Sequence, residues 1–515
     1  MQQGPHLPSP LYGRTVFMFF MLLLSALVPI VKAAPGDFDG DFGFSGKGSA
    51  DVAGADAAYG YAVAMQPDGK IVVGGKCLVI AATSTQMCAI RVLPNGFFDT
   101  SFGSGGSKLI DVGGTGVTEI VYAVAVQPDG KIVLAGACGP ETNPTEICVV
   151  RLEANGSLDS GFGLSGKSRI GFAGSGNQEA RAVAVLPNGK ILLGGRCAGP
   201  TLGELGVCIV RLNANGTLDT SFASSGRSIA STTLIERLKD MRVRPDGRIL
   251  IATEGEEIRI PGPNTFAVYV SQLTAAGSWD STFGVSGTTI VQTGLVSRPM
   301  PRIAVQPDGQ TVLAYVLNGN TPKGVRLQTG GTVDISYSYP NPAIGVSVDG
   351  HTFGLKPVLQ SDGRVVFVGT SYAISSPSAT VDFLLYRALD NGVLDSSYTG
   401  FGAKPILSAS DVAHDAAVQV DGKLVVVGTC DAGSTFRMCV ARFESTAAAA
   451  RNCSMDIDGD GRVLPMTDAL ILARASLGLS GAAVLNGIAT TGPRNTWPLI
   501  RDFLVNQCGM SNLAP

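Results

Sequence analysis

Hydrophobic and polar positions alternate along most of the chain in a pattern that repeats. An alternating stretch such as YAVAM, at 61–65, is followed by Pro-Asp-Gly and then by a fully apolar stretch such as IVVGG, at 71–75. Alternation with a period of two predicts a half-buried β-strand, and the continuous apolar stretch predicts a strand covered on both faces. Pro-Asp-Gly predicts a tight turn between them, because Pro presets φ, Asp bonds its own backbone and Gly accepts positive φ.

This unit recurs about every sixty residues, which is typical of a repeat array. After the apolar strand come a loop, a strand such as CAIRV at 88–92, often an Asn-Gly turn, and a segment of the type LDTSFG. Each unit therefore predicts about four short strands and little helix. The turn glycines that mark the units are Gly69, Gly130, Gly189, Gly247, Gly309, Gly363 and Gly422.

These units predict an all-β fold, a seven-bladed β-propeller over residues 35–446, because stacked four-stranded blades cover strands that are apolar on both faces. An open β-solenoid is the alternative. The LDTSFG-type segment follows units one to six but is missing after unit seven, where RFESTAAAA stands at 442–450. A copy, FDGDFG, stands at 38–43 instead. We therefore expect the N-terminal segment to complete the last unit and close the ring.

The pattern PDGKIxxxG…RLxxNGxLDxxFG resembles the delta-60 repeat family over roughly residues 37–444. Units four to six depart from it, since Gln272 stands where other units have Arg and Ser336-Tyr337-Ser338 replaces Ser-Phe-Gly. The resemblance implies a tandem β-repeat architecture and brings no established activity. The strand arginines are expected to bond the LD carboxylate and neighbouring backbone, the alternative being that they line a channel and bind an anion.

The first 34 residues predict a cleaved secretory signal peptide. Arg14 precedes an apolar run at 16–31, and small residues follow at 33–34. An uncleaved anchor is the alternative, and no later segment is long and apolar enough to span a bilayer. We expect a secreted protein, located outside the cell, at the cell surface or in the periplasm.

The cysteine pattern supports an oxidising compartment. Four of the units hold two cysteines each at equivalent places, and units four to six hold none. Such usage predicts one disulfide bond inside each of the four units. Cys453 and Cys508 are expected to form a fifth bond in the C-terminal region. The four pairs within units are Cys77 and Cys88, Cys138 and Cys148, Cys197 and Cys208, and Cys430 and Cys439.

The pattern changes after a linker at 447–452. The stretch CSMDIDGDGRVLPMTDALILARASLG, from residue 453 onward, resembles a dockerin-type calcium repeat. Residues 453–515 are therefore expected to form a small α-helical, EF-hand-like module that binds Ca²⁺ through hard oxygen ligands. The predicted ligands are the carboxylates of Asp456, Asp458, Asp460 and Asp468 and the carbonyl of Arg462.

Two departures from the dockerin pattern limit what this module implies. Thr467 stands at loop position twelve, so Asp468 is the preferred closing ligand and Thr467 is expected to cap the following helix. The second half, at 486–509, has no ligand series, so docking to a cohesin partner is not expected. DFDGDFG, at 37–43, is the alternative Ca²⁺ loop, although Phe42 replaces the required Gly.

Charge and motifs exclude several classes of partner and of catalytic site. The net charge is −3 and no basic tract is present, so neither nucleic acid nor a membrane surface is an expected partner. No nucleophile elbow or phosphate loop is present. His6, His351 and His414 share no motif and are expected at the surface.

The sequence predicts a secreted, non-catalytic propeller that binds an unknown glycan or protein ligand and carries a Ca²⁺-stabilised C-terminal module. The alternative is an extracellular polysaccharide-active enzyme with an attachment tail. Its site would lie in the divergent loops of units four to six, such as EGEEIRIPGPN at 254–264.

Overall fold

The structure is a computed structural model. It describes residues 34–114, 117–140, 145–172, 177–198, 205–230, 235–257, 259, 262–318, 321–339, 354–372, 381–398, 402–407, 410–444, 457–458, 467, 470–476, 479–488, 490 and 495–506. Residues 1–33 of the predicted signal segment, which spans 1–34, lie outside this part of the chain.

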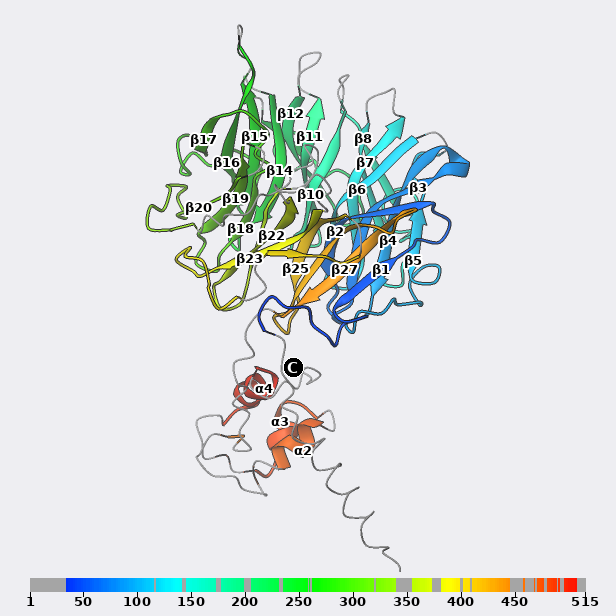
Figure 1. The fold of residues 1–515 in the computed structure, drawn as a ribbon, viewed down its shortest axis with the longest axis vertical. Helices are drawn as coiled ribbons and strands as arrows, with labels where there is room; N and C mark the ends of the chain where they lie inside the picture. The colour runs from blue at the N-terminus through cyan, green and yellow to red at the C-terminus, as the bar shows by residue number, and fades with distance from the viewer. Residues whose placement is uncertain are drawn as a thin grey trace, which may run out of the picture. The chain divides into compact units, whose positions relative to one another are not determined.

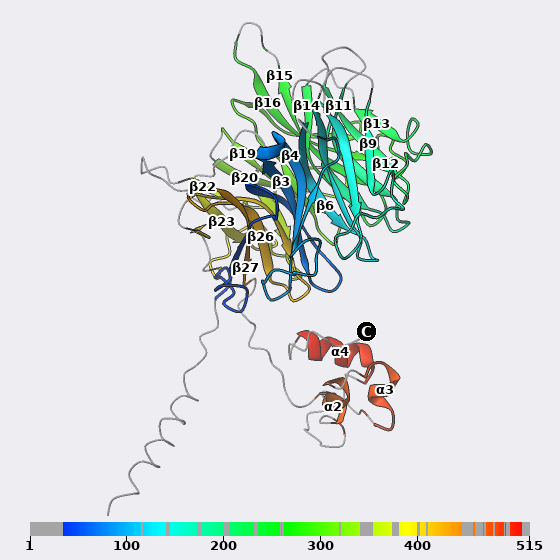
Figure 2. The ribbon, with the colours of Figure 1, turned by 90° about the vertical axis from the view of Figure 1, so that its right-hand side faces the viewer.

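The described repeats are built almost entirely of short antiparallel strands (Figures 1 and 2). Each unit begins with a strand and a tight turn that ends in Gly, Pro-Asp-Gly in four of the seven units, and Gly69 at the first of these turns has a φ of 82°. The strands, in chain order, are β1 (Lys47–Ala50), β2 (Ala57–Met65), β3 (Ile71–Val79), β4 (Ser84–Val92), β5 (Ser107–Ile110), β6 (Val117–Val126), β7 (Ile132–Pro140), β8 (Glu146–Leu152), β9 (Lys167–Ile170), β10 (Glu179–Val185), β11 (Ile191–Ala198), β12 (Leu205–Leu212), β13 (Arg227–Ala230), β14 (Ile235–Val243), β15 (Ile249–Glu257), β16 (Thr265–Leu273), β17 (Thr288–Leu295), β18 (Arg302–Val305), β19 (Thr311–Leu317), β20 (Thr321–Leu327), β21 (Lys356–Leu359), β22 (Val365–Tyr372), β23 (Val381–Ala388), β24 (Gly402–Lys404), β25 (Asp411–Val418), β26 (Leu424–Asp431) and β27 (Phe436–Phe443).

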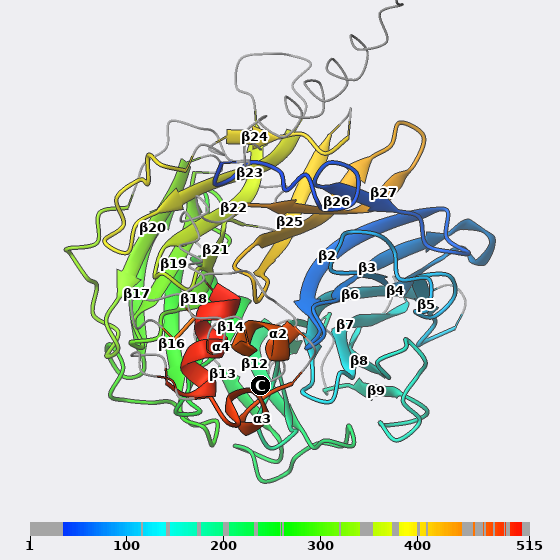
Figure 3. The same cartoon turned by 90° about the horizontal axis from the view of Figure 1, so that it is seen from below.

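The sheets surround a common centre, as Figure 3 shows. The strand that opens each unit contacts the opening strand of the next unit, in the order β2, β6, β10, β14, β18, β21 and β25, and β25 contacts β2 again. The fold is therefore a closed β-propeller ring, and the open solenoid is excluded.

The prediction of seven separate four-stranded blades is wrong. In the described residues, five sheets have the size of a single blade: four of them have four strands, and β18–β20 form one of three. The remaining sheet has eight strands, because β4 and β6 are joined by a parallel pairing of Thr85 with Thr118. The Thr85 hydroxyl also accepts a hydrogen bond from the Glu119 backbone N–H over 3.1 Å. The repeats therefore form five separate blades and one double-sized sheet.

The prediction of N-terminal closure is confirmed. β1 pairs antiparallel with β27, so that Lys47 lies opposite Ala441 and Ala50 opposite Met438. The resulting sheet has the order β1-β27-β26-β25 and joins the two ends of the repeat region. The LDTSFG-type copy at 38–43 thus leads into the outer strand of the last sheet, β1, as the other copies lead into the outer strands of the other four-stranded units.

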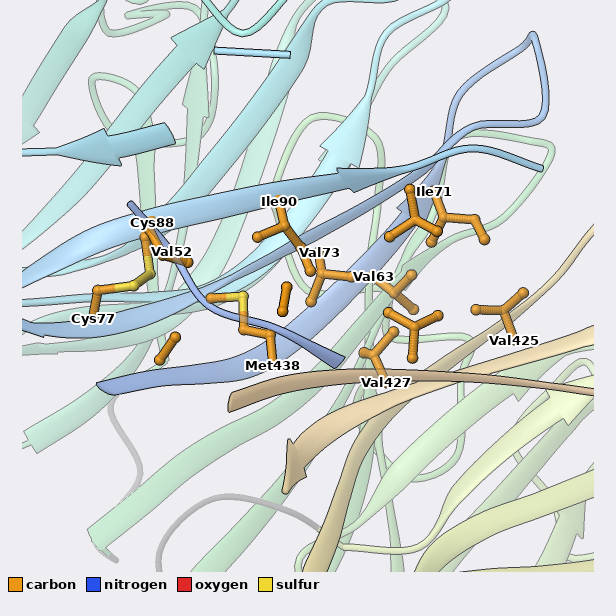
Figure 4. Close-up of a cluster of buried hydrophobic side chains, with 14 of the residues drawn as sticks. Val52, Val63, Ile71, Val73, Cys77, Cys88, Ile90, Val425, Val427 and Met438 are labelled. Atoms are coloured by element: carbon orange, nitrogen blue, oxygen red, sulfur yellow. A yellow bond between two sulfur atoms is a disulfide. The ribbon is translucent and has the colours of Figure 1, made fainter. Parts of the chain in front are cut away.

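Apolar side chains fill the spaces between neighbouring sheets. Figure 4 shows one such cluster, in which Val63, Val73 and Ile90 of the first unit face Val427 and Met438 of the last. Val73, Ile90 and Val427 are completely buried. The opposite faces of β3 and β26 pack in neighbouring clusters through Val72 and Val426. Both faces of each strand are thus covered, which explains why these strands carry continuous apolar sequences.

The four predicted disulfide bonds within units are present, with Cα–Cα distances between 5.7 and 5.9 Å. Disulfide bonds persist in oxidising compartments, so the protein belongs outside the cytoplasm. Cys453 and Cys508 lie outside the described residues. None of the helices in the described part of the chain has the length and apolar character of a membrane span.

The predicted EF-hand-like helical module is not shown by the described residues. An EF-hand needs a helix on both sides of its loop, whereas the sequence offered a helix only after it. The described C-terminal residues instead pack three short helices, with Ile471, Val484 and Ile500 completely buried among them. These helices are α2 (Leu470–Ser476), α3 (Ala482–Leu485) and α4 (Trp497–Asn506), and one 3-10 turn, η1 (Ile80–Ala82), lies in the repeats.

Candidate functional site

In five of the seven units the opening strand contains a bulge, where its register against the next strand shifts by one residue. In β2 the register shifts between Gly60 and Ala62, so Tyr61 has no partner on β3. A bulge redirects side chains and is common beside functional sites. The bulged residues in the other units with this shift are Tyr122, Arg181, Lys239 and His414.

The residue that follows the bulge changes character around the ring. It is alanine in units one to three, at Ala62, Ala123 and Ala182. In units four and seven it is Asp240 and Asp415. In units five and six the equivalent residue is the first one of the short opening strand, Arg302 of β18 and Lys356 of β21. We call these four charged residues the channel belt.

Asp415 is held in the belt by three groups. Its Oδ2 accepts the backbone N–H of Val63 over 2.9 Å. Its Oδ1 forms an ion pair with the ammonium of Lys356 and lies 3.9 Å from the guanidinium of Arg302. Burial alone would raise the pKa of Asp415, but Lys356 and Arg302 outweigh it and lower this pKa. Asp415 is therefore a carboxylate that links units five, six, seven and one.

Asp240 and Arg302 connect units four and five. Asp240 accepts the backbone N–H of Ile303 over 3.0 Å and the guanidinium N–H of Arg242 over 2.8 Å. Arg302 donates to the carbonyl of Lys239 over 3.1 Å. Nε of Arg302 is buried and has no hydrogen-bond partner among the described residues. One donor of the belt thus remains unused.

The belt faces a central cavity of about 210 Å³, smaller than the roughly 300–1,000 Å³ of sites for drug-sized ligands. Four cationic and two anionic side chains belong to its described lining. Arg181 is paired with Glu179, which is not part of the lining, over 3.0 Å, so the local excess is at least one positive charge. The charged residues of the lining are Arg181, Asp240, Arg242, Arg302, Lys356 and Asp415.

A buried ion cluster lies on β14 and β15. Glu254 is completely buried, and its Oε1 lies 3.3 Å from Nζ of Lys239 and within 3.9 Å of Arg237 and Arg298. Burial lowers the pKa of Lys239 to about 8, although Glu254 opposes this shift. The stretch from Glu254, which the sequence suggested as a candidate loop, therefore begins inside a strand, and Glu254 neutralises cations there.

The strand arginines have the structural role that the sequence predicted. Arg91 forms an ion pair with Asp99 over 2.8 Å and donates to the carbonyl of Ala154 in the next unit. Its guanidinium lies 4.8 Å from the ring centroid of the buried Phe102. Arg442 repeats this arrangement across the closure, where it donates to Asp39 over 2.6 Å. None of these arginines belongs to the described lining of the cavity.

His414 is buried, so the prediction of a surface position was wrong for this residue. Only 6% of it is exposed, its Nε2 lies 3.1 Å from the hydroxyl of Thr429, and its ring makes a T-shaped contact with Tyr61. The bulge of β25 turns it inward. His6 and His351 lie outside the described residues.

Of the predicted calcium ligands the structure describes only Asp458, of which 1% is exposed. Asp456, Asp460, Arg462 and Asp468 lie outside the described residues, so the structure does not show whether these residues meet. No cluster of three or more His, Cys, Asp or Glu side chains suited to a metal occurs in the described part of the chain. In the alternative loop, Asp39 is bound to Lys423 and Arg442.

Sequence reasoning missed the channel belt. Each belt residue replaces a small residue inside an otherwise ordinary strand, and a periodic pattern tolerates such a replacement. The signal that could have found it is the alignment of the units on their turn glycines. That alignment places Asp240, Arg302, Lys356 and Asp415 in one register with the three alanines.

The fold and the lining define the class of protein as a β-propeller with a charged central cavity. The family model described as "Domain of unknown function (DUF5122) beta-propeller" matches residues 66–102, 127–162, 186–222 and 360–398. These segments run from the Pro-Asp-Gly turn to the LDTSFG-type segment in units one, two, three and six. The repeats therefore match a family of propeller repeats. No curated protein matches the chain.

Solved structures with a similar fold include proteins of different kinds. A protein of unknown function from Dyadobacter fermentans is 12% identical, with 63% of this chain and 94% of that chain covered and a TM-score of 0.39. The β-propeller domain of the Trilobed protease from Pyrococcus furiosus is 14% identical, with 76% and 96% covered and a TM-score of 0.37. An α-L-arabinanase from Penicillium chrysogenum is 12% identical, with 66% and 98% covered and a TM-score of 0.40. At these scores no argument about activity follows.

Proposed function

We propose that the protein is a secreted binding protein that holds a small anionic group in the central cavity of its propeller. The observation that carries this proposal is the excess of cationic side chains around the cavity. A guanidinium presents N–H groups in a fixed fork that matches a carboxylate or a phosphate. The four disulfide bonds support a location outside the cytoplasm, and secretion follows from the predicted signal at 1–34.

The cavity favours binding over hydrolysis of a polysaccharide. A glycoside hydrolase of the usual kind needs one carboxylic acid whose pKa is raised so that it can donate a proton. In the described lining, Asp415 has a lowered pKa and Asp240 accepts hydrogen bonds from Ile303 and Arg242. Burial raises the pKa of Glu119 and Asp411, but both carboxylates accept backbone N–H groups of nearby loops and do not line the cavity.

Calcium remains part of the proposal for the C-terminal region. Asp456, Asp458, Asp460 and Asp468 with the carbonyl of Arg462 offer the hard oxygens that Ca²⁺ prefers. The ion would order this stretch ahead of α2, which begins at Leu470. The repeats need no such ion, because disulfide bonds and apolar clusters already hold them.

Calorimetry with citrate as the probe tests the anion site. We expect citrate to bind at low ionic strength and more weakly in high salt, because salt screens charge. Arg302→Gln and Lys356→Gln should each weaken binding at least about tenfold, since each removes a charge-assisted hydrogen-bond donor. Arg364→Gln, which removes a half-buried cation that pairs with Asp362 and Asp395 and does not line the cavity, is the matched control. Citrate binding that is absent, or equal in all variants, would contradict the proposal.

A further inference from the structure

A row of aromatic side chains leads into the central cavity. Phe436 of β27, which is 42% exposed, lies 5.3 Å from Tyr59, measured between ring centroids. Tyr59 lies 6.5 Å from Tyr61, and Tyr61 is stacked on Tyr122 at 6.3 Å with 14° between the ring planes. Tyr59, Tyr61 and Tyr122 are half-buried. The row crosses from the last unit to the first and then to the second.

Cations lie along this row. Nζ of Lys76 lies 4.9 Å from the ring centroid of Tyr59. The guanidinium of Arg181 lies 3.8 Å from the ring centroid of Tyr122, a distance typical of a cation–π contact. Burial would lower the pKa of Arg181, but Glu179 and Tyr122 outweigh it and raise this pKa, so the group stays charged. The row therefore combines partly exposed aromatic rings with fixed positive charge.

The aromatic row and the channel belt are parts of one surface. Tyr122 and Arg181 end the row and also line the cavity into which Arg302 and Lys356 project. A ligand that follows the rings thus meets the cationic side chains at the inner end. Such a ligand needs extended faces of low polarity and at least one acidic group.

We propose that the ligand is an acidic saccharide, whose sugar rings rest on the aromatic row while its acidic group reaches Arg302 and Lys356. This inference rests on the proposed anion site. A sugar ring offers a C–H face to an aromatic ring and hydroxyl groups at its edge, which suits tyrosines that combine an apolar ring with a polar end. A single aromatic acid would use one ring, whereas a row of four rings fits a chain of several sugar units.

Calorimetry on the mature full-length chain tests this inference with four probes: trigalacturonate, a sulfated trisaccharide, neutral maltotriose and ringless citrate. We expect one of the two acidic trisaccharides to bind at least about tenfold more tightly than citrate, because stacking adds to the charge interaction. The preferred member of that pair identifies the acid as a carboxylate or a sulfate. Maltotriose should bind more weakly than either.

Variants separate stacking from charge. Tyr61→Ala should weaken binding of the preferred acidic trisaccharide about tenfold and leave citrate unchanged. Tyr61→Phe should retain most of the affinity. If the alanine variant does not fold, Tyr61→Leu takes its place as the variant that removes the aromatic ring. Phe97→Ala is the matched control, because Phe97 is 46% exposed and its described aromatic contact is with the exposed Phe44, away from the row.

The outcomes distinguish the two proposals. Citrate binding without any preference for the acidic trisaccharides, or a preference that survives Tyr61→Ala and Tyr61→Leu, overturns the saccharide inference and leaves the anion site intact. Maltotriose that binds as tightly as the acidic trisaccharides overturns the requirement for an acid. If neither citrate nor any saccharide binds, both proposals are overturned.

Discussion

Arg244 and Gln272 occupy each other's positions in the fourth repeat unit. Most units have Gln three residues before the turn glycine and Arg on the third strand, and in the first unit Arg91 donates to Oε1 of Gln66 over 3.3 Å. In the fourth unit the two residue types are exchanged. Oε1 of Gln272 and Nε of Arg244 are consequently buried without a hydrogen-bond partner among the described residues.

The exchange preserves the links that hold the ring. Gln66 donates to the carbonyl of Gly130 in the next unit over 3.0 Å, and Arg244 makes the equivalent bond to Gly309 over 2.8 Å. Gln272 donates to Asp280 over 2.8 Å, as the strand arginines do to their own aspartates. The exchange removes the positive charge from the third strand, and with it the ion pair between that strand and Asp280.

Restoring the usual order should stabilise the protein. We expect the double variant Arg244→Gln, Gln272→Arg to raise the free energy of unfolding by about 1–2 kcal/mol, because a charged hydrogen bond replaces unpartnered atoms. Gln272→Arg alone should be destabilising, since it places two guanidinium groups side by side. Urea unfolding of the four species gives the coupling energy, and strictly additive effects would show that the two positions are independent.

The closure of the ring predicts a large effect at Asp39. This side chain is 2% exposed and accepts hydrogen bonds from Arg442 over 2.6 Å and from Lys423 over 2.7 Å. Asp39→Asn should lower the free energy of unfolding by about 3 kcal/mol, because it leaves buried cations without their counter-charge. Asp41→Asn, two residues away at an exposed position, is the control. Equal urea midpoints for the two variants would refute a role of the closure in stability.

Acid should unfold the repeats through one aspartate per unit. Burial would raise the pKa of Asp159, but Lys131, the N–H of Gly161 and Arg151 outweigh it and lower this pKa to about 2. A carboxyl whose folded pKa lies below the unfolded value of 3.8 stabilises the fold above that value, and the stability is lost as the pH falls toward 2. The pKa is lowered at all equivalent positions, Asp39, Asp99, Asp159, Asp219, Asp280, Asp334 and Asp395.

Two buried carboxyls act in the opposite direction. Burial raises the pKa of Glu119 and Asp411, so their contribution favours the folded state at lower pH. Because they are fewer, we expect the urea midpoint to be stable from pH 7 to pH 5 and to fall between pH 4 and pH 2. The Asp159→Asn variant should have a lower urea midpoint at pH 7, and this midpoint should decrease less between pH 4 and pH 2. An acid-insensitive midpoint would contradict the assignment.

Calcium should affect the C-terminal region alone. Asp456→Ala with Asp460→Ala should abolish Ca²⁺ uptake measured by calorimetry, because carboxylates supply the ligands that Ca²⁺ prefers. A chelator should increase hydrogen exchange in residues 470–506 and leave the repeats protected. Asp37→Ala with Asp41→Ala is the matched control in the alternative loop. Uptake that survives the first pair and is lost with the second would move the site to that loop.

The sequence predicts features that recur and misses features that occur once. The turn at Gly69, the Arg91–Asp99 ion pair and the disulfide bonds could be predicted because several units repeat them. The closure could be predicted because a repeated segment was missing after Arg442 and present at Phe38. The alanine-to-charge changes at Asp240 and Arg302 are single replacements within strands, so no periodic pattern reveals them.

The sheet count depends on geometry that the sequence pattern does not contain. Thr85 and Thr118 pair because two units approach closely at that point, and Glu119 reinforces the approach through the Thr85 hydroxyl. Nothing in the repeat pattern distinguishes this boundary from the others. The C-terminal analogy rested on a loop motif alone, and the described residues there show three short helices and no EF-hand-like module.

The pairing of β1 with β27 determines when folding of the repeat region can be completed. Asp39 and Arg442 are 403 residues apart, so a chain made from its N-terminus holds β1 without its partner until almost all repeats have emerged. Contacts of such long range form late because the loop between them must first be closed. A chain cut short before β27 keeps β1 and β26 as open strand edges, which are templates for aggregation. Ring closure therefore depends on synthesis as far as β27, because only molecules that contain β27 bury both edges.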